Sequence, residues 1–225
     1  MEEQTIHFRI RPDGRVEELV EGFRGPGCAQ LTERIEAGLG VVQRRQSTAE
    51  AFQPQQQGQS QLQGLGQPLA NPLPISQPIS HPYPRPSQSP PLPLPPMSHF
   101  STIKTELRDR QALLGALRDL GHSPTEGSLQ VRGYRGQTLD AQLAVLQPNG
   151  ADIGFRLNPD TGSYELVTDL DLWNQSVPVE RFVAQLSQRY ALRTILAASA
   201  EAGFELREQT QQQDGTIELV VSRWA

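Results

Sequence analysis

A proline- and glutamine-rich stretch at residues 51–96 divides this chain of 225 residues into two flanks. It holds 13 of the 19 prolines, 10 glutamines, no acidic residue, and Arg85 as its only permanent charge. Proline removes the backbone donors that a helix or sheet needs, so we expect this stretch to be extended and solvated. The sequence therefore predicts a small module at residues 1–50, a disordered linker at 51–96 and a larger domain at 97–225.

The first flank is predicted to form a ββα unit. Apolar and polar residues alternate over residues 6–10, which is typical of a strand with one buried face. A turn at residues 12–14 leads into a return strand over 15–22, and apolar residues at helical spacing predict a helix over 28–39. Residues 41–42 are a candidate for a last short strand. So small a unit buries little surface, and we expect it to lean on a partner surface.

The second flank is predicted to be an α+β domain. A strand over residues 100–107 leads to a helix that Asp109 caps and Gly121 ends, and a second helix begins at Pro178 and ends at Gly203. Further strands are expected at residues 129–132, 141–146, 153–157, 164–170, 204–209 and 216–222. The predicted fold is a mostly antiparallel sheet of about seven strands with two helices on one face.

Charge, cysteine content and hydropathy exclude several classes of protein. The net charge is -5 and Lys104 is the one lysine, so binding to nucleic acid is not expected. The single cysteine, Cys28, can form neither an internal disulfide nor a multi-cysteine zinc site, which favours a reducing, cytoplasmic location. No apolar run approaches the roughly 20 residues of a membrane-spanning helix, so no membrane insertion is expected.

Histidines and carboxylates are the candidates for catalysis. The four histidines are His7, His81, His99 and His122. None forms a ligand pair at helical spacing, so no metal and no cofactor is predicted. His99 lies beside the first strand of the second flank, while Asp152 and Asp169 stand at strand ends where carboxylates can converge. These three are the candidate catalytic residues, and the alternative roles are packing, capping and a solvated strand end.

Aromatic and arginine side chains are the candidates for binding. Tyr134, Arg135 and Trp173 belong to the types enriched at protein interfaces, although they are equally ordinary in a core. The glycines of residues 133–136 could cradle an anion, but a tight turn between two strands requires the same glycines and is favoured. Cys28 stands at a predicted helix start, where a thiolate is stabilised, yet its apolar spacing favours a buried hydrophobic role.

Several motifs of the second flank are those of a known family. They are residues 97–105, 131–134, 152–155, 164–167, Trp173 and 217–224. On these motifs, residues 97–225 resemble the family called hypothetical chloroplast reading frame thirty-five, which is found in cyanobacteria and algal plastids. The resemblance implies no established activity.

Residues 4–50 resemble a second small family of unknown function. The similarity lies in Phe8-Arg9-Ile10 before the turn and in residues 31–36 of the predicted helix. In related organisms the two families are encoded by neighbouring genes, so the resemblance implies that this chain is their fusion. It also implies that the two parts are functionally associated.

Two hypotheses for the function follow. In the first, the chain is a non-enzymatic binding or adaptor protein whose two parts engage one protein assembly, because a tether makes the second contact intramolecular. In the alternative, it is a small enzyme with a carboxylate/histidine site in the second flank. Convergence of His99, Asp152 and Asp169 in one concave site would favour the enzyme.

Overall fold

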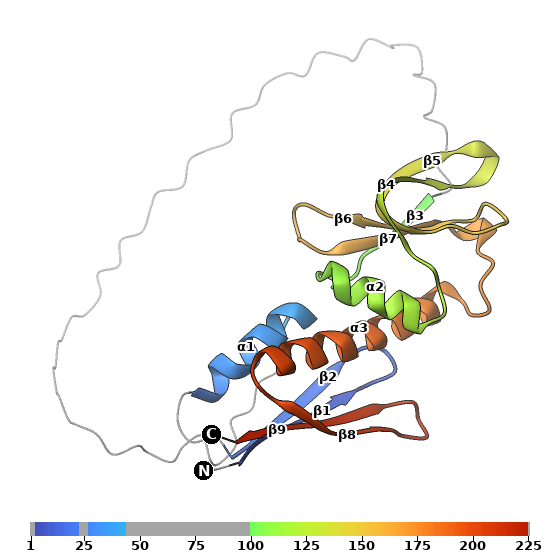
Figure 1. Ribbon diagram of the computed structural model, residues 1–225. Helices are drawn as coiled ribbons and strands as arrows, with labels where there is room; N and C mark the ends of the chain where they lie inside the picture. The colour runs from blue at the N-terminus through green and yellow to red at the C-terminus, as the bar shows by residue number, and fades with distance from the viewer. Residues whose placement is uncertain (1–2, 23–26, 44–99, 225) are drawn as a thin grey trace, which may run out of the picture. The chain divides into compact units, whose positions relative to one another are not determined.

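The computed structural model describes residues 3–22, 27–43 and 100–224 (Figure 1). These residues belong to one compact unit. The predicted linker at residues 51–96 lies outside the described residues, so its predicted disorder stays a prediction.

The fold class is α+β, as predicted, and the strands form two antiparallel sheets. The first sheet has the order β2-β1-β9-β8 and consists of β1 (Glu3–Ile10), β2 (Val16–Glu21), β8 (Glu205–Gln211) and β9 (Ile217–Trp224). The second has the order β3-β7-β6-β5-β4 and consists of β3 (Phe100–Ile103), β4 (Thr125–Arg132), β5 (Thr138–Val145), β6 (Ile153–Leu157) and β7 (Tyr164–Asp169). The helices are α1 (Gly27–Leu39), α2 (Arg110–Asp119) and α3 (Val179–Glu201).

The strands predicted after residue 97 are present, but they are divided between two sheets instead of forming one. The long helix α3 explains the division, because it supplies apolar side chains to two cores. Its Phe182, Leu186 and Tyr190 pack with α2 and the five-stranded sheet. Its Ala191, Leu192 and Ile195 pack with α1 and the four-stranded sheet. In Figure 1, β8 and β9 lie beside β1 and not beside β3–β7.

Strand β1 joins the two flanks of the chain. It pairs antiparallel with β2 on one side and with β9 on the other, from Glu3↔Trp224 to Ile10↔Ile217. Ile6, Phe8 and Ile10, the alternating residues of the sequence pattern, are at most 1% exposed. The surface on which the first flank was expected to lean is therefore supplied by the second flank of the same chain.

The capping of α2 follows the prediction, whereas two predicted strands differ. The Asp109 side chain accepts a hydrogen bond from Ala112 N at 2.6 Å and so begins α2. The strand predicted over residues 100–107 ends at Ile103. Beyond it the Thr105 hydroxyl donates to the Tyr164 carbonyl, and the Tyr164 N–H donates to the Leu107 carbonyl at 2.7 Å. No strand forms at residues 41–42, and Val41 is exposed.

The outer face of the five-stranded sheet carries a small core of its own, made by Val131, Ala141, Ala144 and Val167. Gly154 allows this core to close, because a Cβ atom there would lie only 2.4 Å from Val131 Cγ2. At the end of β4, a Cβ on Gly133 would lie 2.7 Å from the Phe100 ring. The close contacts at these two glycines hold the end of β4 near β3 and β6.

Candidate functional site

Asp152, a predicted catalytic candidate, is fully buried just before β6. Its carboxylate accepts two hydrogen bonds from the Arg132 guanidinium, Nε to Oδ2 and Nη2 to Oδ1, both at 2.8 Å. It accepts two more from the backbone N–H groups of Arg132 at 3.1 Å and Gln147 at 2.8 Å. Both oxygens are therefore engaged in holding the ends of β4 and β5.

Burial tends to raise the pKa of Asp152, but the hydrogen bonds from Arg132 and from the two backbone N–H groups outweigh burial and keep the pKa below its ordinary value. The same ion pair raises the pKa of Arg132. Asp152 is therefore held as a carboxylate, whereas a general acid needs a raised pKa. Arg132 was not among the predicted site residues, because no local pattern links residues 20 positions apart.

Asp169, the second predicted candidate, is fully buried at the end of β7. Its Oδ2 accepts from the backbone N–H of Tyr134 at 2.9 Å, and its Oδ1 accepts from that of Asp171 at 3.1 Å. The strand ends here and a 3₁₀ turn, Leu170–Leu172, begins, so Asp169 and Asp171 do not share a strand face. Asp169 thus caps one turn and anchors a loop at the same time.

The structure brings Asp152 and Asp169 to the same segment of chain but not into an open site. Thr168 Oγ1 donates to the Asp152 carbonyl at 3.1 Å, which places the two strand ends side by side. The carboxylates bind the backbone N–H groups of Arg132 and Tyr134, two residues apart. His99, the third candidate, lies outside the described residues.

The loop that these carboxylates hold is residues 133–137, here named the 133–137 loop. It is a tight turn, as predicted, because Gly133 N donates to Gln137 O at 2.9 Å and Gln137 N donates to Tyr134 O at 3.1 Å. Arg135 has φ 52° and ψ 34°, a left-handed conformation that non-glycine residues rarely adopt. Its guanidinium carbon lies 5.0 Å from the centre of the Tyr134 ring. Tyr134 and Arg135, two of the three predicted binding residues, are exposed at the tip of this loop.

Trp173, the third predicted binding residue, packs on the core between α3 and the five-stranded sheet. Its Nε1 donates to the Val177 carbonyl at 2.8 Å, and its ring meets Phe182 edge to face with centres 5.4 Å apart. His122 contacts the same Phe182 ring at 5.5 Å, and burial lowers the pKa of His122. These contacts give Trp173 a role within the fold.

The remaining histidine and cysteine candidates are His7, His81 and Cys28. His7 is half exposed and lies 3.5 Å from a Glu21 carboxylate oxygen. The backbone of Cys28 is in α1, while its side chain and the whole of His81 lie outside the described part of the molecule. Among the described residues, no group of three His, Cys, Asp or Glu side chains is placed to hold a metal ion.

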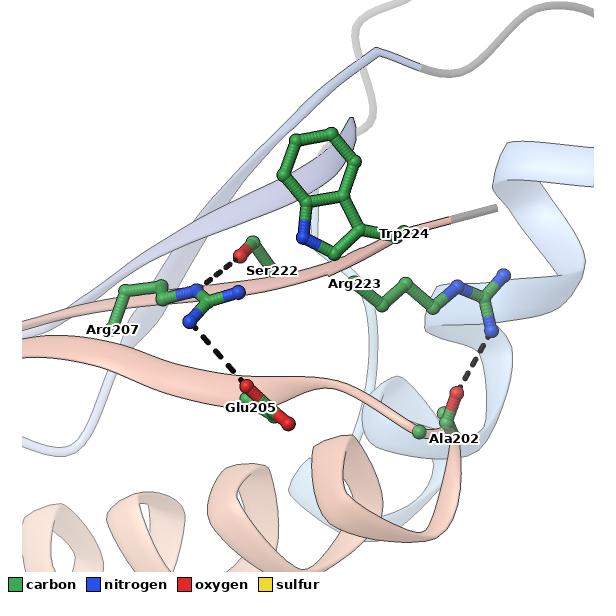
Figure 2. Close-up of a pocket in the computed structure, with 7 residues that line it drawn as sticks. Ala202, Glu205, Arg207, Ser222, Arg223 and Trp224 are labelled. Atoms are coloured by element: carbon green, nitrogen blue, oxygen red, sulfur yellow. Dashed lines mark hydrogen bonds and ion pairs between the residues drawn. The ribbon is translucent and has the colours of Figure 1, made fainter. Parts of the chain in front are cut away.

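A pocket of about 460 Å³ lies where α3 ends and β8 and β9 run side by side (Figure 2). In Figure 2, Arg207 bridges Ser222 Oγ at 2.7 Å and Glu205 at 3.3 Å. Arg223 donates to the Ala202 carbonyl at 2.8 Å. The guanidinium carbon of Arg223 also lies 4.6 Å from the centre of the Phe204 ring. The pocket contains none of the predicted site residues, and both of its arginines make contacts within the fold.

Comparison with known proteins identifies the family. A stretch of 128 residues is 40% identical to "Uncharacterized protein ycf35" of Guillardia theta, and it covers 57% of this chain and 98% of that relative. The chain belongs to the ycf35 family. The ycf35 proteins of Pyropia yezoensis and Cyanophora paradoxa are 38% and 36% identical over 128 residues, again covering 57% of this chain and 98% of each relative.

Two family descriptions match separate parts of this ycf35 family member. Residues 116–220 match "Protein of unknown function (DUF1257)", and residues 6–52 match "Protein of unknown function (DUF2997)". The resemblances of the two flanks to two distinct families of unknown function are thereby confirmed. No solved structure matches the chain. No helix in the described ranges is long and apolar enough to span a bilayer.

Proposed function

We propose that this protein is a non-enzymatic binding protein that acts within a larger protein assembly, with the 133–137 loop as its contact site. The observation that carries this proposal is that two buried carboxylates hold this loop in place. Asp152 and Asp169 hold the backbone on either side of Gly133, and the tip beyond them displays Tyr134 and Arg135. A loop held in this way loses little conformational entropy when a partner binds.

The chemistry of the tip indicates the kind of partner. Tyrosine and arginine are enriched at the energetic centres of protein interfaces. The guanidinium of Arg135 can bind a carboxylate through two parallel hydrogen bonds, and the neighbouring Tyr134 ring offers apolar area. The proposed partner is therefore a protein surface that presents an acidic side chain next to an apolar one.

The backbone of Arg135 supports a role for its side chain. A non-glycine residue in the left-handed region costs roughly 1–2 kcal/mol, a cost that glycine avoids. The chain places arginine there although Gly133 and Gly136 flank it. Strain of this kind is concentrated at binding and catalytic sites.

Charge and composition support the remaining parts of the proposal. The chain is net acidic, with Lys104 as its one lysine, which favours a protein partner over nucleic acid. The proposed location is the cytoplasm, on the strength of the single cysteine. The enzyme alternative lacks comparable support, because the oxygens of Asp152 and Asp169 are used within the fold.

The Arg135→Gly variant separates binding from stability. Glycine adopts the left-handed conformation without strain, which stabilises the folded protein, but it also raises the conformational entropy of the unfolded chain. Because these two effects oppose each other, the free energy of unfolding should stay within about 1 kcal/mol of the parent. Loss of the guanidinium should weaken partner binding about 10- to 100-fold. The measurement is retention of proteins from soluble extract of the source organism, then titration of the retained partner.

The matched control is Arg15→Ala, which removes an exposed arginine from the β1–β2 turn. The proposal is supported if one protein is retained equally by the parent and by Arg15→Ala. The same protein should be retained poorly by Arg135→Gly and by Tyr134→Ala. Equal retention by all four chains would contradict the proposed contact site. Turnover of a substrate that disappears in Asp169→Asn, with the loop intact, would favour the enzyme.

A further inference from the structure

Strand β9 pairs with β1 over its whole length. This pairing hides an apolar edge of the second flank, whose described residues 100–224 are here named the ycf35 part. Ile217, Leu219 and Val221 of β9 are at most 2% exposed. Without β1, β9 would present unpaired backbone groups at the sheet edge, and the core under these side chains would open. Natural proteins avoid long apolar edges of this kind by pairing or covering them.

Helix α3 supplies a second part of the same surface. A Cβ on Gly38 of α1 would lie 2.8 Å from Thr194 Cγ2, and one on Gly14 of the β1–β2 turn would lie 2.5 Å from Ser187 Cβ. Glycine at these positions lets the first flank approach α3 closely. The surface of α3 and that of the first flank are therefore complementary in shape as well as apolar.

Polar groups of α3 and β9 satisfy backbone and side-chain groups of the first flank. Gln188 Nε2 donates to the carbonyl of Ile10 in the first flank at 3.2 Å, and also to that of Gly215, in the turn between β8 and β9, at 2.9 Å. The Tyr190 hydroxyl donates to the Gly38 carbonyl at 3.0 Å. Arg223 Nε donates to Gln4 Oε1 at 2.8 Å. These bonds fix the register in which the first flank sits, which an unspecific apolar contact would not do.

The comparisons divide the chain at the same interface. The 128 aligned residues make up 98% of the Guillardia theta relative, so that relative consists of little more than the ycf35 part. The first flank matches a different family. The surface of β9 and α3 thus belongs to a unit that also occurs without the covalently attached first flank.

We propose that β9 and α3 form a docking site for a ββα chain, and that the described residues 3–22 and 27–43 belong to its tethered occupant. The docking is non-covalent and requires no covalent connection between the two parts. Relatives that consist of the ycf35 part alone would take a separate ββα chain of the same chemistry at this site. This inference is independent of the proposed role of the 133–137 loop.

The test cuts the full chain after it has folded. A protease recognition site is inserted between Ala70 and Asn71, and the purified protein is cleaved there. At about 1 µM, a concentration at which ordinary specific interfaces stay assembled, the two pieces should elute together from a sizing column. Separate elution of two folded or aggregated pieces would overturn the proposal.

Matched variants on β1 show which face carries the docking. Phe8→Gln removes a buried ring, and His7→Gln makes the same replacement at the half-exposed neighbour on the opposite face. Phe8→Gln should weaken the association of the cleaved pieces by about 100-fold or more, and His7→Gln by less than about threefold. Equal effects of the two variants would contradict docking through this face.

A second pair of variants covers the case in which Phe8→Gln fails to fold. Gly38→Leu inserts a side chain against Thr194, and Ala37→Leu adds the same side chain at an exposed position of α1. Gly38→Leu should release the small piece at a protein concentration at least about tenfold higher than the parent needs. Release at the same concentration in Gly38→Leu, Ala37→Leu and the parent would overturn the proposal.

Discussion

Leu117→Asp is expected to leave the protein without a cooperative thermal transition. Leu117 is fully buried on α2, where it packs with the five-stranded sheet and α3. A carboxylate placed there without a partner costs several kcal/mol, on top of the lost apolar contacts. Domains of this size are stable by only about 5–15 kcal/mol, so most of the stability disappears. Far-ultraviolet circular dichroism during heating measures the effect.

The control for Leu117→Asp is Gln111→Asp in the first turn of the same helix. Gln111 is exposed, and an acidic residue near a helix N-terminus is mildly favourable, so this variant should stay within about 0.5 kcal/mol of the parent. A normal melting curve for Leu117→Asp would show that this face of α2 is not the buried one.

Asp152→Ala is expected to lower the free energy of unfolding by about 2–4 kcal/mol. The alanine leaves the backbone N–H groups of Arg132 and Gln147 without their acceptor, and each unsatisfied group costs about 1–3 kcal/mol where it is shielded from water. The Arg132 side chain is half exposed and can turn to solvent, so it adds less. Asp140→Ala, an exposed acid on β5, should change the stability by less than about 0.5 kcal/mol.

The pH dependence of Asp152 is a separate readout of the same bonds. Its pKa in the folded protein is held below the ordinary value, by Arg132 and two backbone N–H groups against the effect of burial. The unfolded chain therefore takes up the proton first. The stabilisation is complete above the unfolded pKa of about 3.9 and is lost as the pH falls through the lower folded pKa.

Asp152→Asn cannot titrate at this position, so its stability should fall less steeply than that of the parent below about pH 4. Urea unfolding of both proteins at a series of pH values measures the difference. Parallel curves would show that Asp152 contributes no acid-sensitive stability.

Local patterns predicted most elements, and long-range pairing accounts for what they missed. The cap at Asp109, the turn at residues 12–14 and the strand over residues 153–157 depend on neighbouring residues and agree with the structure. The pairing of β1 with β9 joins residues more than 200 positions apart, and no local pattern records it. Strands β8 and β9 therefore share a sheet with the hairpin of the first flank, whereas the sequence predicted them in the sheet of the second flank.

The candidate site shows the same division between local and distant information. Asp152, Asp169, Tyr134 and Arg135 were selected by residue type. Their mutual contacts depend on how β4, β6 and β7 lie in the sheet, since Tyr134 and Asp169 are 35 positions apart. Apart from the flanking glycines, nothing in the sequence indicates the left-handed backbone conformation of Arg135. The residue types thus suggested which side chains belong to the site. The structure of the sheet was needed to show that Asp152 and Asp169 hold the 133–137 loop.

Hydrogen exchange of the backbone amides of Arg132 and Tyr134 tests most directly whether the two buried carboxylates hold the 133–137 loop. The amides donate to Asp152 at 3.1 Å and to Asp169 at 2.9 Å. Residue-resolved exchange in the native chain should show both amides protected at least about 100-fold relative to an unstructured peptide, with protection at Tyr134 lost selectively in Asp169→Ala. Fast exchange at both amides in the native chain would contradict the account.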